Sequence, residues 1–107
     1  HIFLNTNHPS LKGNFDHNMK MTHSQSNSEY NQVIRSAVDT LSKNNNKNHI
    51  TLIDIEKSFL NEFDTSTDIK ADVYLLSDGI HLSQEGHELY YKIIEPIINQ
   101  KYKELYE

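Results

Sequence analysis

The sequence predicts an α/β fold, in which helices alternate with strands and the strands form a mostly parallel sheet. Two short apolar runs, residues 1–5 (HIFLN) and 49–55 (HITLIDI), have the composition of strands. Between them, and again at the end of the chain, apolar residues recur at the spacing of an amphipathic helix. The second run is apolar on both faces, which is typical of a parallel strand buried within a sheet.

The first half of the chain is predicted to form a strand, a long loop and a helix. The strand 1–5 leads into a turn that ends at Pro9, and the polar residues 10–28 have no sustained period. Ser28 is the predicted N-cap of a helix that begins at Glu29. One face of this helix carries Tyr30, Val33, Ile34, Ala37, Val38 and Leu41.

The second half is predicted to contain one more strand and two helices. An Asn/Lys tract leads to the strand 49–55, and a short helix over 56–63 and a loop over 64–73 follow. Ser83 is the predicted N-cap of the last helix, in which Pro96 is expected to cause a kink or weaken local hydrogen bonding. The apolar stripe of this helix consists of Leu89, Tyr90, Ile93, Ile94, Ile97 and Ile98.

Length and apolar content favour a part of a larger domain. The chain has 107 residues, and its apolar fraction of 36% is low for a self-sufficient core. Two strands are also too few for a complete sheet. We therefore expect residues 1–107 to form one portion of a single α/β domain.

Charge and cysteine content exclude several functions. The net charge is −5, with no basic cluster, which argues against nucleic acid as the main partner. No apolar run approaches the roughly 20 residues that span a bilayer. Cysteine is absent, which excludes disulfides and thiolate chemistry and favours a reducing compartment, so a cytoplasmic location is expected. Oligomeric state is not predicted.

The segment 75–91, LLSDGIHLSQEGHELYY, contains the strongest functional signal. Asp78 and His81 are three residues apart, and Gly79 between them allows the chain to turn. Histidine exchanges protons near neutral pH, and a carboxylate beside its Nδ1 atom fixes the tautomer and stabilises the imidazolium. The pair is therefore a candidate catalytic base with its orienting carboxylate. The alternative is a polar turn that leads into a helix.

The residues after this pair favour the catalytic interpretation. Ser83 and Gly86 follow within five residues of His81, at the predicted start of the last helix. Glycine is unfavourable in the first turn of a helix. Close approach of another backbone segment would explain Gly86.

The segment LLSDGIHLSQEGHELYYKIIEPII resembles the C-terminal block of SGNH, or GDSL-type, hydrolases. More narrowly, it is similar to the isoamyl acetate-hydrolysing esterases, in which L-(S/T)-D-G-(L/I)-H-(L/F)-S-x-x-G recurs. HIFLNTNHP, the helix that contains Tyr30 and Asn31, and ITLIDI also resemble segments of that family. The resemblance implies a three-layer α/β/α, flavodoxin-like fold and assigns Asp78 as the orienter and His81 as the general base. It further implies a small carboxylic ester as substrate and no metal or other cofactor.

That family also has a Gly-Asp-Ser block with the nucleophile serine and a Gly-x-Asn block with an oxyanion asparagine. Neither block is found in these 107 residues. No serine follows Gly-Asp, and no Gly-x-Asn-Asp occurs; the nearest segment is Gly13-Asn14. We therefore expect the C-terminal part of a hydrolase domain, inactive alone because a base needs a nucleophile and oxyanion donors. The alternative is a non-catalytic binding or structural module, or a truncated inactive homologue.

Other polar residues have weaker functional signals. Asn5, Asn7 and His8 follow a predicted strand at its C-terminal end, where they would line a substrate pocket. Asp54 ends the second strand, either as a functional residue or as a turn acceptor. Of the seven histidines, none shows the converging spacing that zinc requires, so no metal site is predicted.

Overall fold

The computed structural model describes residues 1–11, 21–44, 49–63 and 73–107. The predicted order of strands and helices is confirmed, with most boundaries shifted. The elements are β1 (Ile2–Asn5), α1 (His23–Asn44), β2 (Ile50–Ile53), α2 (Ile55–Phe63) and α4 (Gln84–Tyr106).

The two strands form a parallel pair. Ile2 of β1 lies opposite Ile50 of β2, and the register continues to Asn5 opposite Ile53. The pairing extends one residue further, because the Thr6 amide donates to the Ile53 carbonyl oxygen at 3.1 Å. Both strands therefore end at the same edge of the sheet, where sites form in α/β folds.

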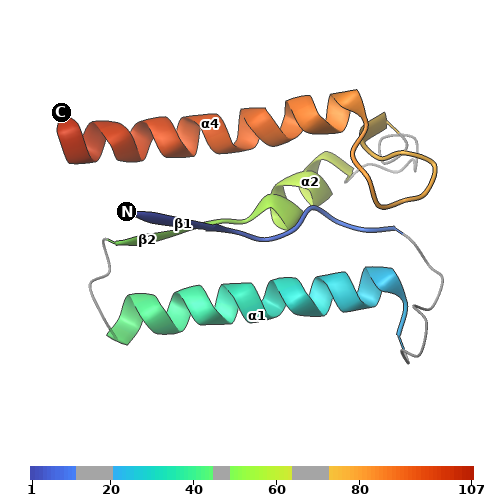
Figure 1. Cartoon of the computed structure of the whole chain (residues 1–107), viewed down its shortest axis with the longest axis horizontal. Coiled ribbons are helices and arrows are strands. Elements are labelled where there is room, and N and C mark those ends of the chain that lie inside the picture. Colours follow the sequence, from blue (N-terminus) through green and yellow to red (C-terminus); the bar gives the residue numbers. More distant parts are fainter. Residues whose placement is uncertain (12–20, 45–48, 64–72) are drawn as a thin grey trace.

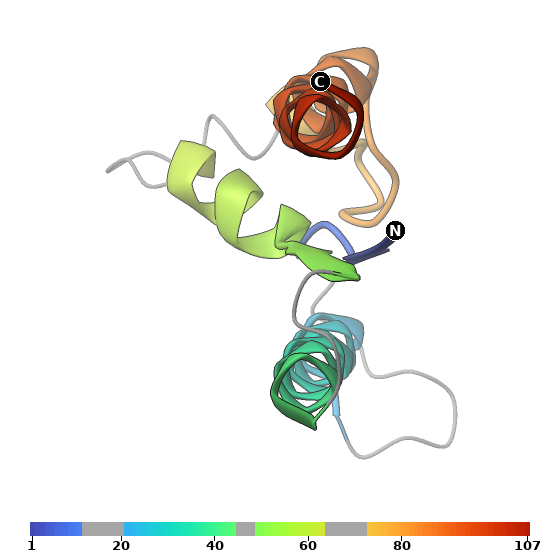
Figure 2. The same cartoon turned by 90° about the vertical axis from the view of Figure 1, so that its left-hand side faces the viewer.

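Helices lie on both sides of this sheet. Figure 1 shows α1 along one side of the strands and α4 along the other, and the end-on view in Figure 2 shows the same three levels. α1 contacts both strands, while α2 contacts α4. The described residues thus form an α/β/α arrangement, and the predicted α/β fold class is confirmed.

The core lies between the sheet and α4. Ile53, Ile55 and Phe59 are its buried centre. The Phe59 ring packs edge-on against Tyr74 and Tyr90, with ring centroids 6.2 and 6.4 Å apart. The predicted stripe of α4 contributes Leu89, Tyr90, Ile93, Ile94 and Ile97 to this core. Ile98, the last residue of the predicted stripe, is instead exposed.

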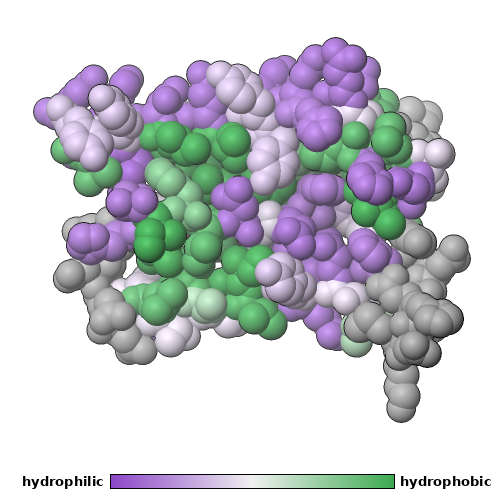
Figure 3. Space-filling view, in the orientation of Figure 1, coloured by the Kyte–Doolittle hydropathy of each residue, from purple (hydrophilic) through white to green (hydrophobic). Residues whose placement is uncertain are grey.

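The face predicted for α1 is buried only in part. Val38 is buried and Ile34 is half-buried, whereas Tyr30, Val33 and Leu41 are exposed. Apolar side chains also gather over the sheet between α1 and α4 (Figure 3), and Ile2 of β1 is 57% exposed. The described part of the chain therefore presents more apolar surface than its own helices cover.

The predicted start of α1 was wrong. The helix begins at His23, so Ser28 lies inside it and is not its N-cap. Thr22 accepts from the Gln25 amide at 3.1 Å, while Gln25 Oε1 accepts from the Thr22 amide at 3.0 Å. This reciprocal pair is a capping box, whose Thr-x-x-Gln signal is present in the sequence. The predicted loop 10–28 is thus shortened from its end, and residues 12–20 lie outside the described part of the chain.

The second strand is shorter than predicted. β2 ends at Ile53, because Asp54 accepts a hydrogen bond from the Lys57 amide at 3.1 Å and starts α2. The short helix predicted over 56–63 is confirmed with one additional residue, Ile55. Of the predicted loop 64–73, only Val73 lies among the described residues.

The predicted N-cap of α4 is confirmed. Ser83 has extended backbone angles, and its hydroxyl accepts from the Gly86 amide at 3.0 Å. α4 continues through Pro96 without a break (Figure 1), so the proline does not end the helix. In the described part of the chain, no helix combines the length and apolar character that crossing a membrane requires.

Candidate active site

Residues 75–82, called the motif loop below, form a closed turn in front of α4. Leu75 and Leu82 make an antiparallel bridge, and the Leu76 amide donates to the His81 carbonyl oxygen at 2.8 Å. The Gly79 amide donates to the Leu76 carbonyl oxygen at 2.9 Å. Gly79 has φ of 73°, a left-handed conformation that glycine adopts without steric cost. The predicted turn at Gly79 is therefore present.

This turn brings Asp78 and His81 together. Asp78 Oδ2 lies 2.5 Å from His81 Nδ1. The other carboxylate oxygen, Oδ1, accepts from the backbone amides of Ile80 at 2.8 Å and His81 at 3.0 Å. One carboxylate thus shapes the turn and orients the imidazole.

The hydrogen bonds set the charge of the carboxylate. The contact with His81, followed by the two backbone amides, holds the pKa of Asp78 well below its usual range. Because an ionised carboxylate only accepts, Nδ1 of His81 must carry a proton. In a neutral ring this leaves Nε2 as the acceptor. Among the described residues His81 Nε2 has no hydrogen-bond partner, and the side chain is 73% exposed.

Gly86 allows α4 to approach the residues before the motif loop. A Cβ atom at residue 86 would lie 2.2 Å from the Tyr74 carbonyl oxygen. That carbonyl accepts from the Ser83 amide at 3.0 Å, which joins the residues before the motif loop to the start of α4. The predicted close approach of another backbone segment is therefore confirmed. It fixes α4 directly behind the candidate base.

The GDSL-like Lipase/Acylhydrolase family matches residues 2–94, which is most of the chain. The chain belongs to this family. The match confirms the resemblance to GDSL-type hydrolases at the level of the family and indicates a hydrolase. Searches of curated proteins and of solved structures found no match.

The Asp-x-x-His pair of this GDSL-like chain lies next to the segment that follows β1. His8 Nε2 lies 2.7 Å from the Ile80 carbonyl oxygen. Asn5 and Asn7 are predicted to line a substrate pocket with His8. Asn7 lines a shallow depression beside the start of α1, and both side chains make hydrogen bonds to other elements. Asn5 donates to the Tyr90 hydroxyl at 3.1 Å, and the Asn7 side chain donates to Asn27 Oδ1 at 3.2 Å.

Asp54 of the GDSL-like chain is hydrogen-bonded to residues of two other segments. Its carboxylate accepts from Arg35 Nε at 2.7 Å and Arg35 Nη2 at 2.8 Å, and from the Thr6 hydroxyl at 3.2 Å. The contact with Arg35 lowers the pKa of Asp54 and raises that of Arg35. Together with its capping of α2, these bonds support the interpretation of Asp54 as a turn acceptor.

A buried asparagine extends this polar network and was not predicted. Asn31 is fully buried; its side chain accepts from the Asn7 amide at 2.7 Å and donates to the Asn7 carbonyl oxygen at 3.0 Å. It also donates to Glu56 Oε2 at 2.8 Å, and Glu56 binds Arg35 at 2.9 Å. Asn31 was noted only as part of a family-like segment, because its partners lie 24 and 25 residues away.

A serine–histidine contact between Ser10 and His23 does not form a candidate site. Ser10 Oγ lies 2.7 Å from His23 Nδ1, but Ser10 is only 6% exposed. A nucleophile must reach its substrate, so this contact is better explained by packing of the loop on the start of α1. Within the described ranges, no three His, Asp or Glu side chains are placed to hold a metal ion.

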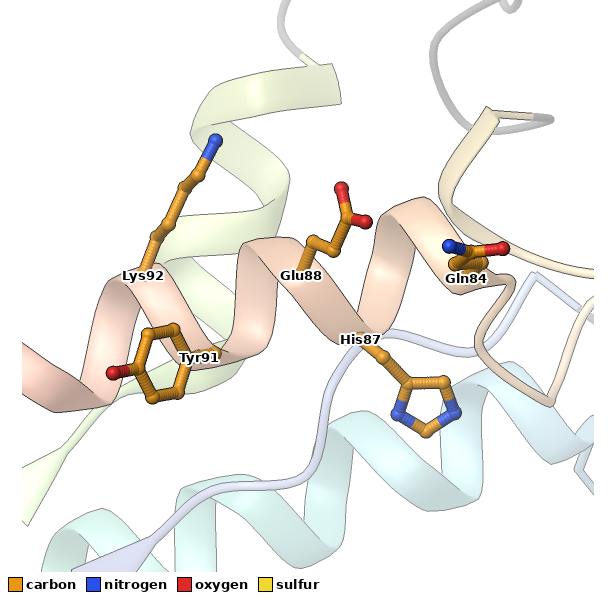
Figure 4. A pocket seen from close by; sticks show the side chains of 5 residues that line it. All are labelled: Gln84, His87, Glu88, Tyr91 and Lys92. Carbon is orange, nitrogen blue, oxygen red and sulfur yellow. The ribbon is translucent and has the colours of Figure 1, made fainter.

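A shallow depression on α4 is separate from the motif loop. It is lined by Gln84, His87, Glu88, Tyr91 and Lys92. Figure 4 shows His87 and Tyr91 pointing to one side of the helix and Glu88 and Lys92 to the other. Neither Asp78 nor His81 lines this depression, so it is a helix surface and not the candidate active site.

Proposed function

We propose that Asp78 and His81 are the orienting carboxylate and the general base of a Ser-His-Asp triad in a carboxylic ester hydrolase. The 2.5 Å contact between Asp78 Oδ2 and His81 Nδ1 carries this proposal. Membership of the GDSL-like lipase/acylhydrolase family supports it. The proposal includes a nucleophile serine outside residues 1–107, because no serine in this sequence follows Gly-Asp.

The proposed reaction has two steps. His81 Nε2 accepts the serine proton while the serine oxygen bonds to the ester carbonyl carbon, and the imidazolium then returns the proton to the departing alcohol. In the second step His81 takes a proton from the water that attacks the acyl carbon. The imidazolium then returns this proton to the serine oxygen as the acid leaves, which regenerates the base and the nucleophile. Asp78 stays ionised in both steps and stabilises the imidazolium through Nδ1. The low pKa of Asp78 supports this role.

Short-chain and acetyl esters are the proposed substrates. The residues LSDGIHLSQEG follow the pattern of the isoamyl acetate-hydrolysing esterases. No metal or other cofactor takes part in the proposed chemistry, since proton transfer and nucleophilic attack use side chains alone.

Residues 1–107 are proposed to be the C-terminal part of one hydrolase domain. The apolar surface over the sheet in Figure 3 supports further packing there. The His81 side chain is 73% exposed, which leaves room for a serine hydroxyl from another segment.

The function is tested by measuring ester hydrolysis. The protein to assay is a polypeptide that contains both residues 1–107 and the proposed serine segment. With p-nitrophenyl acetate, His81→Ala should lower kcat by at least about 10⁴-fold while the far-UV circular dichroism stays unchanged. His87→Ala is the matched control, because His87 is an exposed histidine six residues later. Full activity in His81→Ala would contradict the proposal.

The alternative is a non-catalytic module that kept the α/β scaffold. Its support is the lack of a Gly-Asp-Ser block in this sequence. It predicts that the wild type and His81→Ala hydrolyse p-nitrophenyl acetate equally slowly, even when the neighbouring coding sequence is included.

A further inference from the structure

The segment after β1 is bonded to the motif loop at two points. His8 Nε2 lies 2.7 Å from the Ile80 carbonyl oxygen, and the Leu11 amide donates to the Gly79 carbonyl oxygen at 2.8 Å. Because a carbonyl oxygen only accepts, His8 Nε2 must carry a proton and donate it. His8 and Ile80 are 72 positions apart in the sequence, so this is a tertiary contact. Ile80 directly precedes the candidate base.

His8 is itself fixed to the rest of the fold. Its carbonyl oxygen accepts from Asn27 Nδ2 of α1 at 3.0 Å, and its ring lies beside Phe59, with centroids 6.1 Å apart. The preceding residue, Asn7, is bonded through both backbone groups to the buried Asn31. The His8 side chain therefore extends from a well-anchored backbone to the motif loop.

The hydrogen bonds that Asp78 makes inside the motif loop orient the imidazole of His81. Asp78 binds the amides of Ile80 and His81 and the ring of His81, and all of these lie within three residues. They determine how the imidazole meets the carboxylate. They do not determine where the motif loop lies relative to the sheet, because none reaches another element.

We propose that His8 is a positioning residue, whose Nε2–H bond to the Ile80 carbonyl holds the motif loop against the end of β1. The bond gives His81 Nε2 a defined place relative to the sheet. The hydrogen bond between His8 and Ile80 is called the tether below. The kinetic consequence of the tether rests on the proposed function, but the presence of the tether does not. In the complete enzyme, a displaced base lowers the rate of proton transfer more than it weakens substrate binding.

Three substitutions separate the donor from the ring. His8→Gln keeps an N–H donor at similar reach. Glutamate has the same size as glutamine, but in His8→Glu the side chain offers only acceptors to the Ile80 carbonyl. His8→Phe keeps an aromatic ring beside Phe59 and removes the donor. The Gln and Glu variants form a matched pair that carries the test even where the Phe variant is unfolded.

Amide hydrogen exchange in the 107-residue chain tests the tether without reference to hydrolysis. His8→Glu and His8→Phe should speed exchange of the Leu11 amide at least about 10-fold, because the second bond to Gly79 opens with the first. His8→Gln should stay near the wild type. The Thr6 amide, bonded to Ile53 in the sheet, is the internal control. Wild-type exchange at Leu11 in the Glu variant, or an equal rise at Thr6, would overturn the proposal.

Steady-state kinetics of the complete enzyme test the consequence. His8→Glu and His8→Phe should lower kcat about 10- to 100-fold with KM within about 2-fold of the wild type, and His8→Gln should restore most of kcat. Unchanged kcat in the Glu variant would overturn the positioning role. If the wild-type enzyme showed no hydrolysis that depends on His81, the proposed function would be wrong. The exchange rate of the Leu11 amide would still test the tether.

Discussion

Gly86 in the first turn of α4 lies against the Tyr74 carbonyl oxygen, which a Cβ atom at residue 86 would approach to 2.2 Å. Backbone cannot move aside as a flexible side chain does. Gly86→Ala is therefore expected to lower the free energy of unfolding by about 1–3 kcal/mol, measured by urea denaturation. Glu85→Ala, at an exposed neighbouring position, should have a small effect. Equal denaturation midpoints for the two variants would contradict the close approach.

Gly79 should resist substitution for a different reason, its backbone conformation. With φ of 73°, an alanine at this position would be strained by about 1–2 kcal/mol. Gly79→Asn should cost less, because asparagine enters the left-handed region more readily than alanine. Urea denaturation of both variants checks the order. Alanine equal to or better than asparagine would argue against the turn.

The buried amide of Asn31 should be essential for stability. Asn31→Leu has a similar size but leaves the Asn7 backbone groups and Glu56 without this partner. The expected cost is about 1–3 kcal/mol for each buried group left unpaired, seen as a lower urea midpoint. Gln32→Leu, at an exposed position on the same helix, is the control. A stability loss no larger than in the control would count against the network.

The contact between Arg35 and Asp54 should make stability depend on acid pH. Arg35 holds the pKa of Asp54 below its ordinary value, so the unfolded chain binds the proton more readily than the folded chain. The contribution is fully present above the ordinary pKa of about 3.9 and is lost as pH falls through the lowered value. Arg35→Gln should therefore destabilise the chain by about 2–4 kcal/mol at pH 6 and by less at about pH 3.

Lys43→Gln is the matched control for this pH dependence. Lys43 pairs with Asp39 at 3.0 Å on the same helix, but both side chains are exposed. Exposed pairs contribute about 0–1 kcal/mol, so urea denaturation should show little change at either pH. The same loss in Arg35→Gln at both pH values would contradict the assigned pKa direction.

Local patterns predicted the parts of the fold that depend on neighbouring residues. The β-branched run 49–55, which contains β2, the Ser83 cap and the Gly79 turn each involve residues a few positions apart. The start of α1 was predicted wrongly although its signal, the Thr22–Gln25 pair, is local, because Ser28 before Glu29 also has the pattern of an N-cap.

The features that the sequence did not predict depend on contacts between residues far apart in the chain. Sequence patterns placed His8 at a strand end, but they could not place its ring on Ile80, 72 residues away. The same holds for Asn31, whose polarity gave no reason to expect full burial. The candidate pair was predictable because Asp78, Gly79 and His81 form one turn.

The tautomer of His81 tests most directly whether Asp78 orients the base. Nitrogen-15 NMR of the 107-residue chain at neutral or mildly basic pH should show the neutral ring protonated at Nδ1, with Nε2 unprotonated. Asp78→Asn retains an oxygen for the amides of Ile80 and His81 but removes the carboxylate. It should shift the ring toward the Nε2-protonated tautomer, the form that cannot accept a serine proton. The same Nε2-protonated ring in wild type and Asp78→Asn would contradict the account.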